Sequence, residues 1–216
     1  MTLTTSDGVN IAYDWYPAEK PAGYLVLVHM MSAAKESWRE FAGSAAQNGF
    51  ASIAIDLRGH GQSDGGPEGY NAFSDEEHQQ SIKDVEAAVE FLKQKGAEPK
   101  KIILIGASIG ANLAIWYLAD HSEIKRAVCL SAGESYRGIR IVPMLAKLQP
   151  DQKLLMFASE DDVRNGGSNA SVNTRVVSFV PADVEKELVI FDQGGHGTDL
   201  LPQAASKILE FLKSSI

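Results

Sequence analysis

The sequence predicts an α/β fold, with a mostly parallel, twisted sheet of about eight strands, an antiparallel N-terminal hairpin and helices on both faces. Two observations predict it. Short apolar runs without polar alternation recur along the chain, as in strands that are covered on both faces. Segments with helical periodicity separate these runs, and such alternation implies right-handed crossovers between parallel strands.

The first sixteen residues predict the antiparallel start of the sheet. Strands are expected at Leu3–Thr5 and Val9–Tyr16, joined at Asp7-Gly8, a dipeptide that readily adopts the positive φ of a hairpin turn. Each of six later apolar runs predicts one buried strand: Tyr24–Val28, Ala51–Ile55, Lys101–Ile105, Arg126–Leu130, Lys153–Ala158 and Glu187–Phe191.

Three segments between these runs have helical patterns. The first begins at Ser74, with Glu77 placed to complete a capping box, and ends at Gly96. The second, Ile109–Ala119, is apolar nearly all round, so it is expected to be buried. The third, Pro202–Leu212, has proline in its first turn and one apolar face.

Length and composition favour one domain over residues 1–216 and exclude several classes of protein. The chain has 20 Lys and Arg against 28 Asp and Glu, a net charge of −8, which argues against a nucleic-acid partner. With Cys129 as the one cysteine, neither a disulfide framework nor a Cys/His metal site is available. We therefore expect no metal and no cofactor.

The sequence also bears on localisation. Residues 1–10 are polar and lack the basic and apolar regions of a signal peptide. No apolar run approaches the roughly 20 residues of a membrane span. We expect a cytoplasmic protein that contacts no membrane, whereas its oligomeric state is not indicated.

The residues that follow the predicted strands carry the chemistry, because open α/β sheets bind ligands at the carboxyl ends of their strands. The run Lys101–Ile105 is followed by Gly106-Ala107-Ser108-Ile109-Gly110, which is G-x-S-x-G between a strand and a helix. This sharp turn needs small neighbours and presents its serine as a nucleophile. Ser108 is the predicted nucleophile.

A serine nucleophile needs a histidine base and a carboxylate that orients it. His196 follows the last strand in a Gly-rich loop, whereas His60 lies between two glycines and His78 and His121 are expected on or beside exposed helix surface. We therefore favour His196 as the base.

Three acids follow the run Lys153–Ala158, and they cannot all be buried and ionised together. Of these, we favour Asp162 over Asp161 as the partner of His196. The chain order Ser108, Asp162, His196 is the order of α/β hydrolases.

With the hairpin, the G-x-S-x-G turn, the segment D-L-R-G-H-G-Q-S at 56–63, Asp162 and His196 in matching order, the chain resembles the α/β-hydrolase superfamily over essentially its whole length. It is most similar to compact serine esterases or lipases of the carboxylesterase or dienelactone-hydrolase type. Dienelactone hydrolase uses a cysteine where this chain has Ser108. In the superfamily the loop at 56–63 is a structural turn, so Arg58 is expected to be structural.

An oxyanion hole requires two backbone N–H groups. One is expected from Ile109, the residue after the nucleophile. By the resemblance, the second comes from Met31, because relatives carry His-Gly and then the donor where this chain has His29-Met30-Met31. The methionine at position 30 departs from that pattern.

Many relatives insert a lid domain after the strand that ends at Leu130. Here a short cap-like insert of about 134–152 is expected, with one helix around Ile139–Leu148, so the site should be comparatively open. A shallow substrate groove is expected to be lined by Met30, Tyr136, Ile139 and Met144, together with Met31.

The resemblance implies a serine hydrolase that cleaves a small-molecule carboxylic ester through an acyl-enzyme. A thioester, lactone or amide substrate would use the same residues. Two alternatives remain open: a non-catalytic binding protein on the same fold, and a lyase or cofactor-free peroxidase-type enzyme that retains the triad.

Overall fold

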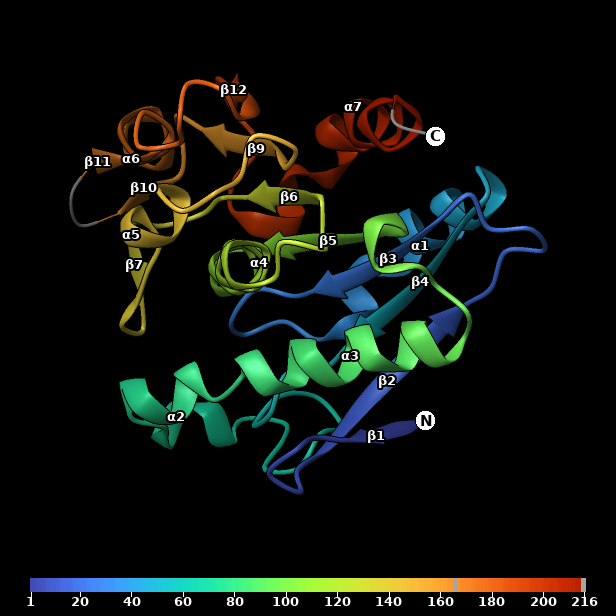
Figure 1. The fold of residues 1–216 in the computed structure, drawn as a ribbon. Coiled ribbons are helices and arrows are strands. Elements are labelled where there is room, and N and C mark those ends of the chain that lie inside the picture. The colour runs from blue at the N-terminus through green and yellow to red at the C-terminus, as the bar shows by residue number, and fades with distance from the viewer. Residues whose placement is uncertain (165–166, 215–216) are drawn as a thin grey trace.

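The computed structural model describes residues 1–164 and 167–214. Its centre is one eight-stranded sheet in the order β1-β2-β4-β3-β5-β6-β9-β12 (Figure 1). The strands are β1 (Thr2–Thr4), β2 (Asn10–Tyr16), β3 (Gly23–Val28), β4 (Phe50–Ile55), β5 (Ile102–Ala107), β6 (Arg126–Leu130), β9 (Lys153–Ser159) and β12 (Glu185–Phe191). β1 pairs with β2 and β2 with β4 in antiparallel fashion, and the pairs from β4 to β12 are parallel. The predicted sheet and its antiparallel start are confirmed.

Helices cover both faces of the sheet. The α-helices are α1 (Arg39–Gln47), α2 (Asp75–Gln79), α3 (Ile82–Gln94), α4 (Ile109–Asp120), α5 (Val142–Leu145), α6 (Asn169–Val177) and α7 (Leu201–Lys213). Single turns of 3₁₀-helix occur at η1 (Lys35–Trp38), η2 (Gly69–Ala72), η3 (Pro99–Lys101) and η4 (Gly197–Leu200). α1 and α7 lie on one face, and α3 and α4 lie on the other (Figure 1).

The central strands are buried on both faces, as their unbroken apolar runs predict. In β3, Val26 and Val28 belong to the core under α3 and α4, whereas Leu25 and Leu27 belong to the core under α1 and α7. β12 differs from this expectation. It is the edge strand, bonded only to β9 among the described strands, and several of its side chains are partly exposed.

The helix expected from Ser74 to Gly96 is two helices, α2 and α3. The capping box at its start is present, because Ser74 Oγ accepts a hydrogen bond from Glu77 N–H at 3.2 Å and the Glu77 carboxylate accepts one from Ser74 N–H. The break at Gln80-Ser81 lets each helix bury a polar side chain, His78 in α2 and Asp84 in α3. The prediction that His78 lies at the exposed surface is therefore wrong, since it is 1% exposed.

The insert after β6 also differs from the expected helix around Ile139–Leu148. It forms a short hairpin, β7 (Ser135–Tyr136) and β8 (Ile139–Arg140), followed by the short helix α5. The turn residues Arg137 and Gly138 have φ of 49° and 75°, a left-handed conformation that a helix does not contain. A second hairpin, β10 (Val163–Arg164) and β11 (Gly167–Ser168), follows β9.

The loop at 56–63 is organised by a buried ion pair. Arg58 donates to Asp84 at 2.7 and 2.9 Å and to Asp7 at 2.8 and 3.1 Å. Burial acts to lower the pKa of Arg58, but the hydrogen bonds to the two carboxylates outweigh it and raise that pKa. The guanidinium thus joins the first hairpin, this loop and α3.

Candidate active site

Ser108 lies at the turn between β5 and α4, with an unusual backbone conformation. Its φ of 55° and ψ of −118° are rare for a residue with a side chain. Two hydrogen bonds hold this conformation: Ser108 N–H donates to Leu130 O at 2.8 Å, and its carbonyl accepts from Ala111 N–H at 2.9 Å. Such a turn projects the hydroxyl from the carboxyl end of the sheet.

The two glycines of G-x-S-x-G are required by close backbone contacts. A Cβ on Gly106 would lie 2.1 Å from Gly110 O, and a Cβ on Gly110 would lie 2.4 Å from Val28 O. Neither contact is possible for a real side chain. The start of α4 therefore packs directly on the end of β3, close to the segment that contains Met30 and Met31.

His196 and Asp162 are in contact at the same end of the sheet. His196 Nδ1 lies 2.5 Å from Asp162 Oδ2, and the Asp162 side chain is 5% exposed. Because a carboxylate only accepts, Nδ1 carries the proton and Nε2 is left as the basic nitrogen. Residue 162 follows β9 and residue 196 follows β12, so neighbouring parallel strands bring the pair together.

Asp161 has a different environment. Its carboxylate is exposed and accepts hydrogen bonds from the N–H groups of Gly194 and Gly195 at 3.1 to 3.2 Å. Asp161 thus holds the loop that carries His196, and Asp162 contacts its ring.

Two further hydrogen bonds anchor this loop. Ser131 Oγ accepts from Gly197 N–H at 2.8 Å, and Ser159 Oγ donates to Gly195 O at 2.7 Å. A Cβ built on Gly197 would lie 3.5 Å from Ala107 Cβ, so the residue after His196 packs on the residue before Ser108. Sequence reasoning missed Ser131 and Ser159. Their position could have indicated them, because each lies at the carboxyl end of a strand, where open α/β sheets bind ligands.

Of the two backbone N–H groups predicted to bind an oxyanion, Ile109 N–H is at the start of α4, directly after Ser108, and Met31 N–H follows β3. Within residues 1–164 and 167–214, neither Ile109 N–H nor Met31 N–H donates a hydrogen bond to a protein group. The Met30 side chain packs under the His196 loop, where its sulfur lies 3.9 Å from Thr198 Oγ1. Met30 therefore fills space below the loop.

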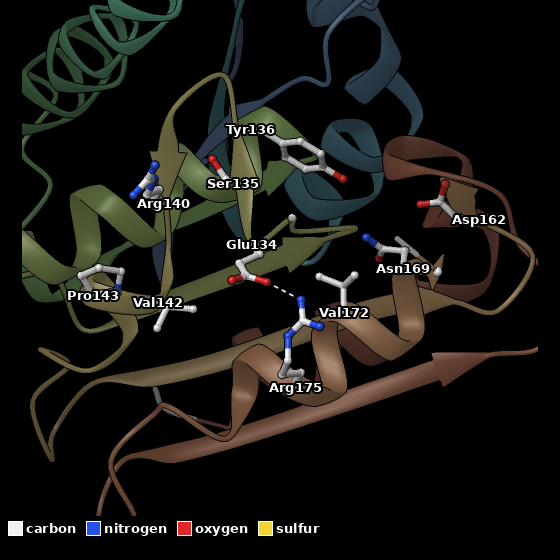
Figure 2. Close-up of a pocket in the computed structure, with 12 residues that line it drawn as sticks. Glu134, Ser135, Tyr136, Arg140, Val142, Pro143, Asp162, Asn169, Val172 and Arg175 are labelled. Carbon is white, nitrogen blue, oxygen red and sulfur yellow. Dashed lines mark hydrogen bonds and ion pairs between the residues drawn. The ribbon is translucent and has the colours of Figure 1, made fainter. Parts of the chain in front are cut away.

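A cavity of about 560 Å³ adjoins this arrangement (Figure 2). Its walls come from the insert and from α6, and its lining residues are Gly133, Glu134, Ser135, Tyr136, Arg140, Val142, Pro143, Asp162, Gly167, Asn169, Val172 and Arg175. Figure 2 shows the ion pair between Glu134 and Arg175 joining the two walls.

The residues predicted to line a substrate groove lie in different places relative to this cavity. Tyr136 lines the cavity and lies edge-on to His196, with ring centroids 6.3 Å apart. Ile139 does not line it, because it is 1% exposed and packs in the core. Met30 and Met144 are half-buried against the two cores and are also outside the lining.

Buried asparagines hold the cavity walls. The Asn112 side-chain amide donates to Gly133 O and Ile139 O at 2.9 and 3.0 Å, and its oxygen accepts from Gly133 N–H. Asn169 and Asn173 both donate to Ala132 O, which ties α6 to the end of β6. Sequence reasoning missed all three asparagines, because a polar residue within a helix gives no indication of its distant acceptor.

Two other buried histidines lie at the 56–63 loop: His60 is part of it, and His29 contacts it. His29 Nδ1 donates to Met30 O at 2.8 Å, and its Nε2 accepts from Leu57 N–H at 3.0 Å, which defines a neutral ring. His60 stacks on Tyr70 with centroids 4.0 Å apart. Burial lowers the pKa of His29 to about 4, with the His60 charge acting in the same direction.

Within residues 1–164 and 167–214, no group of three or more His, Cys, Asp or Glu side chains is arranged to hold a metal ion. No helix in this part of the chain is long and apolar enough to cross a membrane.

Comparisons with solved structures agree with this architecture. An esterase of Pyrococcus furiosus superposes with a TM-score of 0.76 at 19% identity, covering 99% of this chain and 89% of that one. The α/β hydrolase GrgF of Penicillium sp. sh18 superposes with a TM-score of 0.80 at 16% identity, covering 99% and 97%. At such identities the likeness establishes the α/β-hydrolase fold.

Sequence comparisons identify the family. A non-heme chloroperoxidase of Streptomyces lividans is 32% identical over 134 residues, which is 61% of this chain and 44% of the relative. The match thus spans less than half of that relative's length. The family model for serine aminopeptidase, S33, matches residues 19–186, most of the chain. This protein therefore belongs to that family of α/β hydrolases.

Proposed function

We propose that the protein is a serine hydrolase that cleaves small or medium carboxylic esters through an acyl-enzyme. Ser108 Oγ attacks the ester carbonyl, and His196 Nε2 takes its proton. The same proton then passes to the leaving alkoxide, which departs as the alcohol. Water next attacks the acyl-Ser108 bond, again with His196 as base, and releases the carboxylic acid.

The strained conformation of Ser108 is the observation that carries this proposal. A serine with φ of 55° between a strand and a helix is costly by about 1–3 kcal/mol, and the close packing of Gly106 and Gly110 maintains it. An ordinary strand-to-helix turn has no need of that strain. The strained conformation of Ser108 is explained if its hydroxyl must project from the sheet toward a substrate.

The contact between His196 and Asp162 supports the base. The carboxylate fixes the tautomer and stabilises the imidazolium that forms when the ring accepts a proton. Asp162 is buried, so its charge is little screened by solvent. The hydrogen bonds of Ser131, Ser159 and Asp161 anchor the loop that carries His196, and Gly197 in this loop approaches Ala107, the residue before Ser108.

The N–H groups of Ile109 and Met31 are the proposed oxyanion donors. Ile109 begins α4, so its N–H has no acceptor within the helix and gains from the positive end of the helix dipole. Met31 N–H follows β3, on which the same turn packs. A backbone donor is independent of the side chain, so Met30 and Met31 do not exclude it.

The cavity favours substrates of modest size. Its volume of about 560 Å³ suits a compact ligand, and Tyr136, Val142 and Val172 supply apolar walls. Tyr136 is next to His196, so the cavity would receive one side of the ester while Ser108 attacks the carbonyl. A thioester, lactone or amide of similar size would meet the same groups.

A second candidate function follows from the match to a non-heme chloroperoxidase. The same acyl-enzyme could be attacked by hydrogen peroxide, in place of water, to release a peroxy acid and free Ser108. Chromatography of the products formed with an ester and hydrogen peroxide would distinguish the two reactions, because only the second yields the peroxy acid.

The decisive test is labelling with a fluorophosphonate, which reports an activated serine without knowledge of the substrate. Intact-mass measurement should show one adduct on the parent and none on Ser108→Ala. Ser171→Ala, an exposed serine in α6, is the matched control and should be labelled like the parent. If the folded parent takes no adduct, the result contradicts the proposed nucleophile and favours the alternative of a binding protein on a hydrolase fold.

A panel of p-nitrophenyl esters would then define the acyl group. We expect turnover to be highest for short and medium chains, and to disappear in Ser108→Ala. Turnover that is retained in this variant would contradict the proposed nucleophile.

A further inference from the structure

Several basic side chains lie at the amino ends of the central strands, and Ser108 lies at their carboxyl ends. Lys101 directly precedes β5, Arg126 begins β6, and Lys153 begins β9. These strands are adjacent and parallel, and Arg126 pairs in register with Lys153. The amino ends of neighbouring strands therefore bring together cations that are distant in the sequence.

These cations line a second cavity, of about 530 Å³. Its lining residues are Ala22, Lys100, Lys101, Lys125, Arg126, Asp151 and Lys153, five cations and one carboxylate. The chain as a whole has a net charge of −8, so this local excess of positive charge is opposite to the overall balance. A cavity lined mostly by cations attracts anions.

Arg126 differs from the lysines around it. Lys125 contacts Asp151, Lys153 contacts Glu185, and Lys101 contacts Glu98. Arg126 forms no ion pair with any carboxylate of the described residues, although it is only 5% exposed.

The guanidinium of Arg126 retains unused donors. Its one hydrogen bond within residues 1–164 and 167–214 joins Nη1 to Leu212 O, at 3.1 Å, in the last turn of α7. A guanidinium has five N–H groups, so capping this carbonyl leaves most of them available. Its other nitrogens are not among the fully buried polar atoms without a partner, so they retain some access to solvent, and Arg126 is one of the residues that line the cavity.

Such an arrangement is more favourable with an anion than with water alone in the cavity, because an anion supplies the opposite charge as well as hydrogen-bond acceptors. Burial penalises the cation and lowers the pKa of Arg126, and no carboxylate of residues 1–164 and 167–214 forms an ion pair with it. Proteins pair or neutralise buried charges. A bound anion would supply the missing partner.

We propose that this cavity is a binding site for a phosphate or polyphosphate group. The planar guanidinium matches two phosphate oxygens at once. Lys100 and Lys101, which share Glu98, and Lys125, which contacts Asp151, lie around it. The lining contains no aromatic side chain on which a nucleobase could stack. The structure therefore favours a phosphate without an attached base.

This site is separate from the proposed active site. The strands between them have five to seven residues, so the two ends of the sheet are about 20 Å apart. Binding here requires neither Ser108 nor His196, and it can be tested whether or not the protein hydrolyses esters.

The test is titration calorimetry with inorganic pyrophosphate, with inorganic phosphate and sodium acetate as comparisons. We expect the parent to bind pyrophosphate more tightly than phosphate, and acetate weakest. Arg126→Met should weaken pyrophosphate binding at least tenfold. Lys83→Met, which removes one charge from the first turn of α3 outside this lining, should leave the affinity unchanged.

Thermal unfolding provides a second measurement. Without added anion, Arg126→Met should unfold at or above the temperature of the parent, because the variant no longer buries an unpaired cation. Pyrophosphate should raise the midpoint of the parent and of Lys83→Met, and should leave that of Arg126→Met where it was. Lys153→Gln, which keeps Arg126, should show a reduced shift.

Three results would overturn the site. The first is a parent for which titration with pyrophosphate gives no more binding heat than titration with sodium chloride at equal ionic strength. The second is an equal affinity in the parent and Arg126→Met. If Arg126→Met does not fold, an unchanged affinity in Lys153→Gln is the third.

Discussion

The hydroxyl of Ser131 accepts a hydrogen bond of 2.8 Å from the N–H of Gly197, the residue that follows His196. Ser131 directly follows β6, and Gly197 begins η4. The bond therefore fixes the position of the histidine loop relative to the sheet. Ser131 is itself held in a left-handed conformation, with φ of 53°, by its N–H bond to Phe157 O.

Removing this hydroxyl should impair turnover more than folding. Ser131→Ala leaves the buried Gly197 N–H without an acceptor, a cost of about 1–3 kcal/mol. As His196 would then be less well placed, we expect kcat to fall by roughly tenfold or more, with KM little changed. Ester hydrolysis should be measured beside Ser178→Ala, which removes an exposed hydroxyl from the end of α6. An equal kcat in both variants would contradict the positioning role.

Asp162 and Asp161 should differ sharply when each is changed to asparagine. Asp162→Asn removes the charge that orients His196 and should lower kcat by roughly 10³–10⁴-fold. The reason is that the carboxylate no longer keeps the proton on Nδ1, so Nε2 is no longer held ready to act as the base. Asp161→Asn affects hydrogen bonds to Gly194, Gly195 and the Ser159 side chain and leaves the contact between Asp162 and His196 in place, so a loss of about tenfold or less is expected. The measurement is kcat for one ester in all three proteins. A larger loss in Asp161→Asn would reverse the assignment.

The contact of Gly110 with β3 makes this residue intolerant of any side chain. Its Cβ would lie 2.4 Å from Val28 O and 2.7 Å from His29 O, both in the backbone. Gly110→Ala should therefore lower the free energy of unfolding by about 3 kcal/mol or more. Gly43, inside α1, has nothing within 4 Å of a Cβ, so Gly43→Ala should raise that free energy by about 0.5–1 kcal/mol. Urea denaturation of both variants tests the contrast, and equal effects would refute it.

Buried His29 should make the protein less stable in mild acid. Burial lowers its pKa from 6.5 to about 4 in the folded state. Between those values the unfolded chain binds the extra proton and the folded chain does not, so the free energy of unfolding falls as pH falls. Stability should be full above pH 6.5, and by pH 4 the loss due to His29 should reach about 3 kcal/mol.

Urea denaturation between pH 7.5 and pH 4.5 tests this dependence. Protonation would also break the bond that His29 Nε2 accepts from Leu57 N–H. His29→Gln retains an acceptor without a titratable ring. Its free energy of unfolding should therefore decrease less between pH 7.5 and pH 4.5 than that of the parent, by about 2 kcal/mol. His121→Gln, at a half-exposed position, should follow the parent. If His29→Gln loses as much stability as the parent, His29 is not the source.

The order of strands and helices was largely predictable, because buried parallel strands leave unbroken apolar runs and helices leave a periodic face. β6 was predicted with its observed ends, and α4 and α7 within one residue at each end. α1 and α6 were missed. Their apolar faces are narrow and interrupted by polar residues such as Asn169 and Asn173, whose partners lie in other elements.

The amino-acid sequence by itself determined the fold class and the turn at Ser108, because both depend on residues adjacent in the chain. Only the tertiary structure decided which acid contacts His196, and which residues line the cavity. Asp161 and Asp162 are neighbours in one loop, and Ile139 was as apolar as any other candidate. The same holds for Arg126, whose neighbours are set by strand order. Contacts between distant residues depend on how strands pair and in which register, and no local pattern encodes that.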